Sequence, residues 1–204
     1  MCLCLLVGDS IFALAKDDLN WVLRSDGWNT TVDAYPGAGV RNGGFTFVDW
    51  PSRLRDLVAY VRPTVVVVEL GTNGCGQCDS VPDAINADMQ QLRDIEVVLW
   101  LNTATFGPRG AQGRQVNAAI DAAARQWDNL EVLSFDDWFE GRTDLIPADD
   151  VHPTPDGERA LAQHIGDALS DRAGGSKDDR GSQAMGLLAV VVAAAVLLRG
   201  KSRT

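Results

Sequence analysis

Short apolar runs alternate with amphipathic segments along most of the chain. Three runs are apolar without alternation and rich in β-branched or aliphatic residues, which is typical of strands buried on both faces of a parallel sheet. These are Leu3–Val7, Thr64–Leu70 and Glu96–Leu101, and two weaker candidates are Thr30–Ala34 and Leu130–Leu133. Apolar residues at helical spacing predict helices over Phe12–Arg24, Trp50–Val61, Val81–Leu92, Gly113–Trp127 and Pro155–Leu169. Strands that alternate with helices predict a three-layer α/β domain, in which helices cover both faces of a parallel central sheet.

The predicted domain covers residues 1–172, and the composition changes after it. Residues 173–183 are mainly glycine, serine and charged residues, as in a flexible linker. Ala184–Leu198 is then apolar throughout, and the chain beyond it is basic. A helix of this length extends for about 22 Å, which is short of the ~30 Å hydrocarbon core of a bilayer. A helix buried in the domain would also be apolar, but the linker and the basic end favour a hydrophobic membrane tail over residues 184–204.

The start of the chain gives no sign of a secretory signal peptide. Met1 leads directly into Cys2–Val7, without a basic start or a small-residue cleavage site. We expect this run to form the first strand, although a leader upstream of a misplaced start codon stays open. Basic residues beyond the tail favour a cytoplasmic C-terminus, which would place the domain outside. The expected location is therefore membrane-associated, at the cell surface.

The charge of the chain narrows the classes of partner. The formal net charge is −10 at pH 7, and because the linker and tail are basic, the predicted domain is more acidic than the whole chain. An acidic surface repels phosphate backbones, which argues against nucleic acid as a partner. Neutral or cationic substrates fit this charge better.

A candidate nucleophile, Ser10, follows the first predicted strand in the sequence Gly8-Asp9-Ser10. Ligands of open α/β sheets bind at the carboxyl ends of the strands. A serine at the start of the next helix also lies where the helix dipole favours developing negative charge. The alternative is that Ser10 or Asp9 only caps that helix.

Two further segments follow predicted strands. Gly71-Thr72-Asn73-Gly74 comes directly after Thr64–Leu70. Asn-Gly is a common turn sequence, but the Asn73 side chain could also stabilise an oxyanion at the same sheet edge as Ser10. Tyr35–Gly39 follows the weaker strand, so that Gly37 or Gly39 could bring a backbone N–H to the same place. The glycines from Gly37 onward lack the G-x-G-x-x-G spacing of a dinucleotide loop.

A candidate base, His152, precedes the last predicted helix. Asp149 lies three residues before it, and a carboxylate at that spacing can hold the histidine Nδ1–H and leave Nε2 free as a general base. The alternative is a loop histidine without a catalytic role. The chain has one other histidine, His164, which falls inside the predicted helix and is excluded on that ground.

Taken together, these segments resemble the SGNH hydrolases, also called GDSL-like esterases, over about Leu3–Leu169. Gly8-Asp9-Ser10 is similar to the first conserved block of that family, Gly71-Thr72-Asn73 to its third, and Asp149-x-x-His152 to its fifth. The segments around Val66–Gly74 and Leu99–Thr103 are similar to SGNH domains of bacterial cell-wall acyltransferases, which act on O-acetyl groups of peptidoglycan or other surface polysaccharides.

The resemblance implies an SGNH, flavodoxin-like fold and a serine-hydrolase site that needs no cofactor or metal. Ser10 would be the nucleophile, His152 the base and Asp149 the acid that orients the base. The oxyanion hole would comprise the Ser10 N–H, the Asn73 side chain and the N–H of Gly37, with Gly39 as a near alternative. The expected substrates are small acyl esters, O-acetyl groups on carbohydrate above all, with either water or a sugar hydroxyl as acceptor. A lipase or thioesterase for longer chains and a catalytically silent glycan-binding module are the alternatives.

Two of the four cysteines, Cys75 and Cys78, border the candidate site. Their position does not suit a thioredoxin-like motif. Zinc would need two further ligands, and Cys2 and Cys4 fall on a predicted buried strand. A local disulfide and a pair of free thiols both remain open.

Overall fold

The computed structural model of the chain describes residues 2–42, 47–146 and 151–170. It divides into two compact units, Met1–His164 and Ile165–Thr204, and the fold below is that of the first unit. In the second unit the described residues, 165–170, are helical. The predicted linker and membrane tail lie outside the described residues. Within the described part of the chain, no helix has the length and apolar character needed to cross a bilayer.

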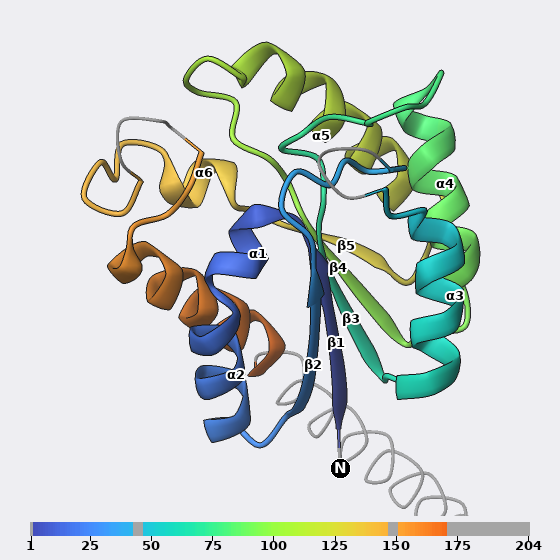
Figure 1. Cartoon of the computed structure of the whole chain (residues 1–204), viewed down its shortest axis with the longest axis horizontal. Helices are drawn as coiled ribbons and strands as arrows, with labels where there is room; N and C mark the ends of the chain where they lie inside the picture. Colours follow the sequence, from blue (N-terminus) through green and yellow to red (C-terminus); the bar gives the residue numbers. More distant parts are fainter. Residues whose placement is uncertain (1, 43–46, 147–150, 171–204) are drawn as a thin grey trace, which may run out of the picture. The chain divides into compact units, whose positions relative to one another are not determined.

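The first unit is built on a five-stranded, fully parallel sheet (Figure 1). The strands are β1 (Leu3–Gly8), β2 (Asn29–Ala34), β3 (Val65–Glu69), β4 (Val97–Leu101) and β5 (Leu130–Leu133). Their order in the sheet is β2-β1-β3-β4-β5. The prediction of an α/β fold with a parallel central sheet is confirmed. Each predicted strand is present and shifted by at most one residue at either end.

Helices cover both faces of this sheet (Figure 1). On one face lie α3 (Trp50–Val61), α4 (Val81–Leu92) and α5 (Gly110–Ala124), and on the other α1 (Ser10–Leu14) and α2 (Lys16–Ser25). A short helix, α6 (Asp136–Phe139), follows β5, and residues 155–164 are helical. The side chains of Leu5, Val66 and Val98 pack into the core beneath α3 to α5. Side chains alternate between the two faces along a strand, so the residues next to these three in the sequence face α1 and α2.

Two helix predictions differ from the structure. The predicted helix Phe12–Arg24 is two helices, α1 and α2, which are separated at Ala15. Nothing in the local sequence marks this break, because alanine and lysine both favour helices. Ala15 is fully buried, so its place is set by packing onto the sheet. The predicted Gly113–Trp127 helix begins and ends three residues earlier, as α5.

Candidate active site

The candidate residues gather where the order of the strands reverses. β1 is paired with β2 on one side and with β3 on the other, so the connections that leave β1 and β3 diverge. Such a switch point opens a crevice at the carboxyl ends of the two strands. Ser10 follows β1 and Asn73 follows β3, and the last residues of the two strands, Gly8 and Glu69, are register partners.

Ser10 and His152 are hydrogen-bonded although they lie far apart in sequence. The Ser10 Oγ and the His152 Nε2 are 2.9 Å apart. Asp9 is the N-cap of α1, because its Oδ1 accepts a hydrogen bond of 3.0 Å from the Ile11 amide. The capping role therefore belongs to Asp9, and the Ser10 hydroxyl is available to His152. Asp149, the predicted orienting acid, lies outside the described residues and stays a prediction.

The amide group of Asn73 is fixed in one orientation by three partners. Its Nδ2 donates to Asp9 Oδ2 over 2.8 Å and to the carbonyl oxygen of Ala38 over 3.1 Å. Its Oδ1 accepts from Arg109 Nη1 over 2.8 Å. A flipped amide would set its oxygen against two acceptors. Both hydrogen bonds from Nδ2 are therefore already made. An oxyanion bound at Asn73 would have to share one of these hydrogens with Asp9 or with Ala38.

The two loops that carry Asn73 and the candidate glycines are joined to each other. The amides of Val40 and Arg41 donate to the carbonyl oxygens of Gly74 and Cys75 over 2.9 and 3.0 Å. Cys75 and Cys78 form a disulfide. The sequence left open whether these cysteines are paired or free, and in the structure they are paired. The disulfide closes the loop just after Asn73. It thereby holds the surface on which the glycine loop packs.

Both candidate glycines have a local reason to be glycine. Gly37 has a φ of 80°, a conformation that side chains disfavour. At Gly39, an added Cβ would stand 2.6 Å from the Gly76 nitrogen and 2.8 Å from the Cys75 carbonyl carbon. The close approach of the two loops thus requires glycine at position 39. Geometry alone does not separate their roles, and Gly37 stays the predicted oxyanion donor.

Beneath the nucleophile lies a pair of buried carboxyl groups, Asp9 and Glu69. Asp9 is fully buried and Glu69 is 4% exposed. Burial raises the pKa of Asp9 from 3.8 to about 6, against hydrogen bonds that lower it. Burial and the neighbouring Asp9 raise the pKa of Glu69 well above its usual 4.5. Two adjacent buried carboxyl groups resist double ionisation, so the pair holds a proton to a higher pH than an isolated carboxyl group would.

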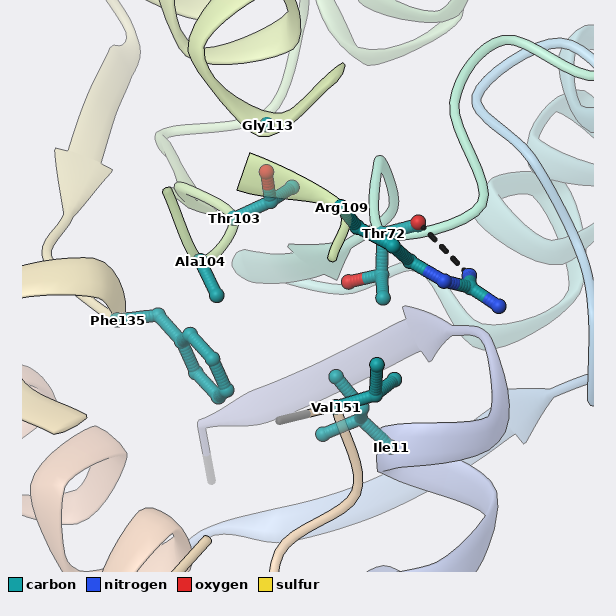
Figure 2. A pocket seen from close by; sticks show the side chains of 8 residues that line it. All are labelled: Ile11, Thr72, Thr103, Ala104, Arg109, Gly113, Phe135 and Val151. Carbon is teal, nitrogen blue, oxygen red and sulfur yellow. Dashed lines mark hydrogen bonds between the residues drawn. The ribbon is translucent and has the colours of Figure 1, made fainter. Parts of the chain in front are cut away.

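A small cavity is lined by residues that neighbour Ser10 and His152 in the chain (Figure 2). Ile11 and Val151, the residues next to Ser10 and His152, form one wall, and the Phe135 ring points toward them. Its other lining residues are Thr72, Thr103, Ala104, Arg109 and Gly113. The cavity volume is about 10 Å³, which is close to the space that one water molecule needs. The recess therefore suits a group of about the size of a methyl.

The second histidine, His164, has partners of its own. Its Nε2 lies 2.9 Å from the Ser134 carbonyl oxygen, and its ring stacks on Trp138. Among the residues that the structure describes, no group of three or more His, Cys, Asp or Glu side chains is placed to hold a metal ion.

Sequence reasoning missed two residues of this site, Glu69 and Arg109. A signal for Glu69 was present, since a carboxylate at the end of an apolar strand is rarely buried without a partner. Arg109 gives no such signal. It lies at the N-terminus of α5, far from Asn73 in sequence, and only the fold brings the two together.

Several solved structures have a similar fold. The C-terminal catalytic domain of peptidoglycan O-acetyltransferase A from Streptococcus pneumoniae matches with a TM-score of 0.66 and 14% identity, over 83% of this chain and 93% of that one. A carbohydrate esterase of family 3 from Talaromyces cellulolyticus matches with a TM-score of 0.64 and 17% identity, over 84% and 97%. A GDSL-like lipase from Parabacteroides merdae matches with a TM-score of 0.55 and 13% identity, over 83% and 95%. At these identities the likeness concerns the fold.

Sequence comparison supplies the family. No protein with a curated function is significantly similar to the chain. The model of the GDSL-like lipase/acylhydrolase family matches residues 6–160, a span that holds Ser10, Asn73 and His152. The chain is thus a member of the GDSL-like lipase/acylhydrolase family.

Proposed function

We propose that the protein is a serine esterase that removes small acyl groups, O-acetyl above all, from carbohydrate or cell-envelope glycan. The observation that carries the proposal is the 2.9 Å contact between Ser10 Oγ and His152 Nε2, at the carboxyl end of β1. A hydroxyl at hydrogen-bond distance from an imidazole is the arrangement that nucleophilic acyl transfer requires.

The proposed reaction has two halves. His152 Nε2 takes the proton of the Ser10 hydroxyl while Oγ bonds to the ester carbonyl carbon, and the carbonyl electrons move to its oxygen. The tetrahedral species collapses, the bond to the leaving alcohol breaks, and His152 gives its proton to that alcohol. Water then attacks the acyl-enzyme in the same way. Asp149 would hold the His152 ring throughout.

The negative oxygen of the tetrahedral species needs preorganised donors. The Ser10 N–H lies at the first position of α1, where a helix offers no intrahelical partner. Asn73 Nδ2 lies beside the residue that precedes Ser10. The Gly37 N–H is the proposed third donor, with Gly39 as the alternative.

The size of the recess supports a small acyl group. A cavity of about 10 Å³ lined by Ile11 and Val151 has room for a methyl-sized group. The similar folds include an O-acetyltransferase domain and carbohydrate esterases, which supports an acetylated glycan as substrate.

Hydrolysis of a small activated ester tests the proposal. We expect the wild-type chain to hydrolyse an activated acetyl ester, and Ser10→Ala to lose at least about 10³-fold in kcat. A fluorophosphonate should label the wild type and not Ser10→Ala. Unchanged turnover or labelling in that variant would contradict the proposal, and an unlabelled wild type would favour a silent glycan-binding module.

A series of esters separates acyl specificities. Activity should fall steeply from acetyl to butyryl and longer chains, whereas the reverse order would favour a lipase or thioesterase. Product analysis on O-acetylated cell-wall glycan, with and without a second glycan as acceptor, then distinguishes hydrolysis from acetyl transfer.

We also propose that the protein is membrane-associated at the cell surface. Support comes from the apolar segment Ala184–Leu198 and the basic residues that follow it. The full chain should remain with the membrane fraction after an alkaline wash, and removal of residues 184–204 should release it. External protease should reach the domain in intact cells, and a protected domain would contradict the proposed orientation.

A further inference from the structure

Glu69 is a buried carboxyl group for which the proposed reaction has no direct use. It is the last residue of β3 and is 4% exposed. Its register partner is Gly8, the glycine that precedes Asp9 and Ser10. A Cβ at Gly8 would stand 2.9 Å from Glu69 Oε2 and 2.8 Å from Phe12 Cβ. The glycine is thus required by the close approach of both the Phe12 side chain and the Glu69 carboxyl group to β1.

The Glu69 carboxyl group is bound to the chain segment that carries the nucleophile. Its Oε2 accepts a hydrogen bond of 3.0 Å from the Asp9 amide. The Phe12 amide and the Asp9 side chain also lie within hydrogen-bonding reach of it and affect its pKa. A hydrogen bond between two carboxyl groups requires one of them to hold a proton. Glu69 therefore contacts the start of α1 both through the backbone and through a shared proton.

Asp9 connects Glu69 to the reacting groups. Its Oδ1 accepts from the Ile11 amide over 3.0 Å and lies 3.5 Å from Ser10 Oγ. Its Oδ2 accepts from Asn73 Nδ2 over 2.8 Å. The Asp9 carboxyl group is thus hydrogen-bonded both to the start of α1, which carries Ser10, and to the side-chain amide of Asn73, the proposed oxyanion donor.

We propose, on the basis of the function proposed above, that Glu69 is a positioning residue for acyl transfer. It shares one proton with Asp9 and thereby holds the Asp9 carboxylate, which in turn fixes the Asn73 amide beside Ser10. The role needs a donor at position 69 and does not need a negative charge there. Misplacement of the groups around a reacting centre by about 1 Å lowers rates by up to about 10²-fold.

Two variants test the role of the donor. Glu69→Gln keeps a donor in the place of the carboxyl proton, whereas Glu69→Leu keeps the approximate volume and removes the donor. With an activated acetyl ester, we expect Glu69→Leu to lower kcat by about 10- to 100-fold with KM within about 2-fold of wild type. Glu69→Gln should restore kcat to within about 3-fold of wild type, because the hydrogen bond to Asp9 is kept.

Asp88→Asn is the matched control. Asp88 is also a fully buried carboxyl group, but it lies on α4, and burial raises its pKa well above the usual value. Its substitution should change the free energy of unfolding and leave kcat unchanged. Wild-type kcat in Glu69→Leu, or an equal loss in Glu69→Gln and Glu69→Leu, would overturn the positioning role.

A measurement that does not depend on turnover separates this inference from the proposed function. The side-chain NH₂ signals of Asn73 in an NMR spectrum, assigned by their loss in Asn73→Asp, report its hydrogen bond to Asp9. They should shift in Glu69→Leu and stay at their wild-type positions in Glu69→Gln. If the wild type proves inactive on all esters, this shift still supports the positioning role, and unshifted signals in both variants overturn it.

Discussion

Asn73 Nδ2 donates a hydrogen bond of 2.8 Å to Asp9 Oδ2, so the proposed oxyanion donor is held by the residue that precedes the proposed nucleophile. The two residues lie at the ends of neighbouring strands, β3 and β1. Because Asp9 also caps α1, a displacement of its carboxyl group would move the start of the nucleophile helix and the oxyanion donor together.

Removal of the Asn73 amide should lower the rate and leave binding almost unchanged. Loss of one oxyanion donor lowers kcat by about 10²- to 10³-fold, and we expect Asn73→Ala to fall in that range, with KM little changed. Steady-state kinetics on an activated acetyl ester give both values. Gln112→Ala is the control, because Gln112 donates to the neighbouring Thr72 carbonyl oxygen and not to Asn73. A loss of less than about 3-fold in Asn73→Ala would remove it from the oxyanion hole.

Arg109 should contribute a smaller effect through the same amide. It donates through Nη1 to Asn73 Oδ1 over 2.8 Å and to the Thr72 carbonyl oxygen over 3.1 Å, and it is exposed. The loss of such hydrogen bonds is worth about 1 kcal/mol, so Arg109→Ala should lower kcat by about 5-fold. Arg114→Ala is the control, since Arg114 lies on α5 and donates to the carbonyl oxygen of Thr105, which precedes that helix. Equal kinetics in the two variants would contradict the role of Arg109.

The buried carboxyl pair should make stability depend on pH in a defined direction. Burial raises the pKa of Asp9 from 3.8 to about 6, so in this range the folded chain binds more protons than the unfolded chain. The stabilisation from this group is fully present below about pH 4 and is lost as the pH rises through about 6. The pKa of Glu69 is raised as well, so the stabilisation from that group is likewise lost as the pH rises.

Urea unfolding at pH 4 and pH 7 measures this dependence. The fall in the free energy of unfolding between the two values should be smaller in Asp9→Asn than in the wild type. Asp94→Asn, at a carboxyl group with a 90% exposed side chain, should keep the wild-type fall. An identical fall in wild type and Asp9→Asn would show that Asp9 does not titrate in this window.

The disulfide between Cys75 and Cys78 should stabilise the loop that follows Asn73. Closure of so short a loop is worth about 2 kcal/mol in the chain-entropy model, so Cys75→Ala/Cys78→Ala should unfold more easily by about that amount. Because the loop packs on Val40 and Arg41, we also expect a lower kcat. Cys2→Ser, at an exposed free thiol, is the control. Equal urea midpoints for the double variant and the control would contradict the prediction.

The sequence was sufficient for the strands of the sheet and for the residues that follow them. Runs such as Leu3–Val7 are apolar without alternation, because both faces of each central strand are covered, and this local signal needs no knowledge of the fold. Residues directly after such runs must lie at the carboxyl edge of the sheet, which is why Ser10 and Asn73 could be found. The catalytic roles of Ser10, Asn73, His152 and Asp149 stay predictions.

The tertiary structure alone decided which of these residues meet. The strand order β2-β1-β3-β4-β5 sets β1 beside β3, and so Asp9 beside Asn73, whereas hydrophobic periodicity carries no information on strand order. The partnership of Glu69 with Asp9, the reach of Arg109 to Asn73 and the break at Ala15 all depend on contacts between distant segments. Local propensity governs which elements form, but the burial of charged and polar groups is settled only when those elements pack.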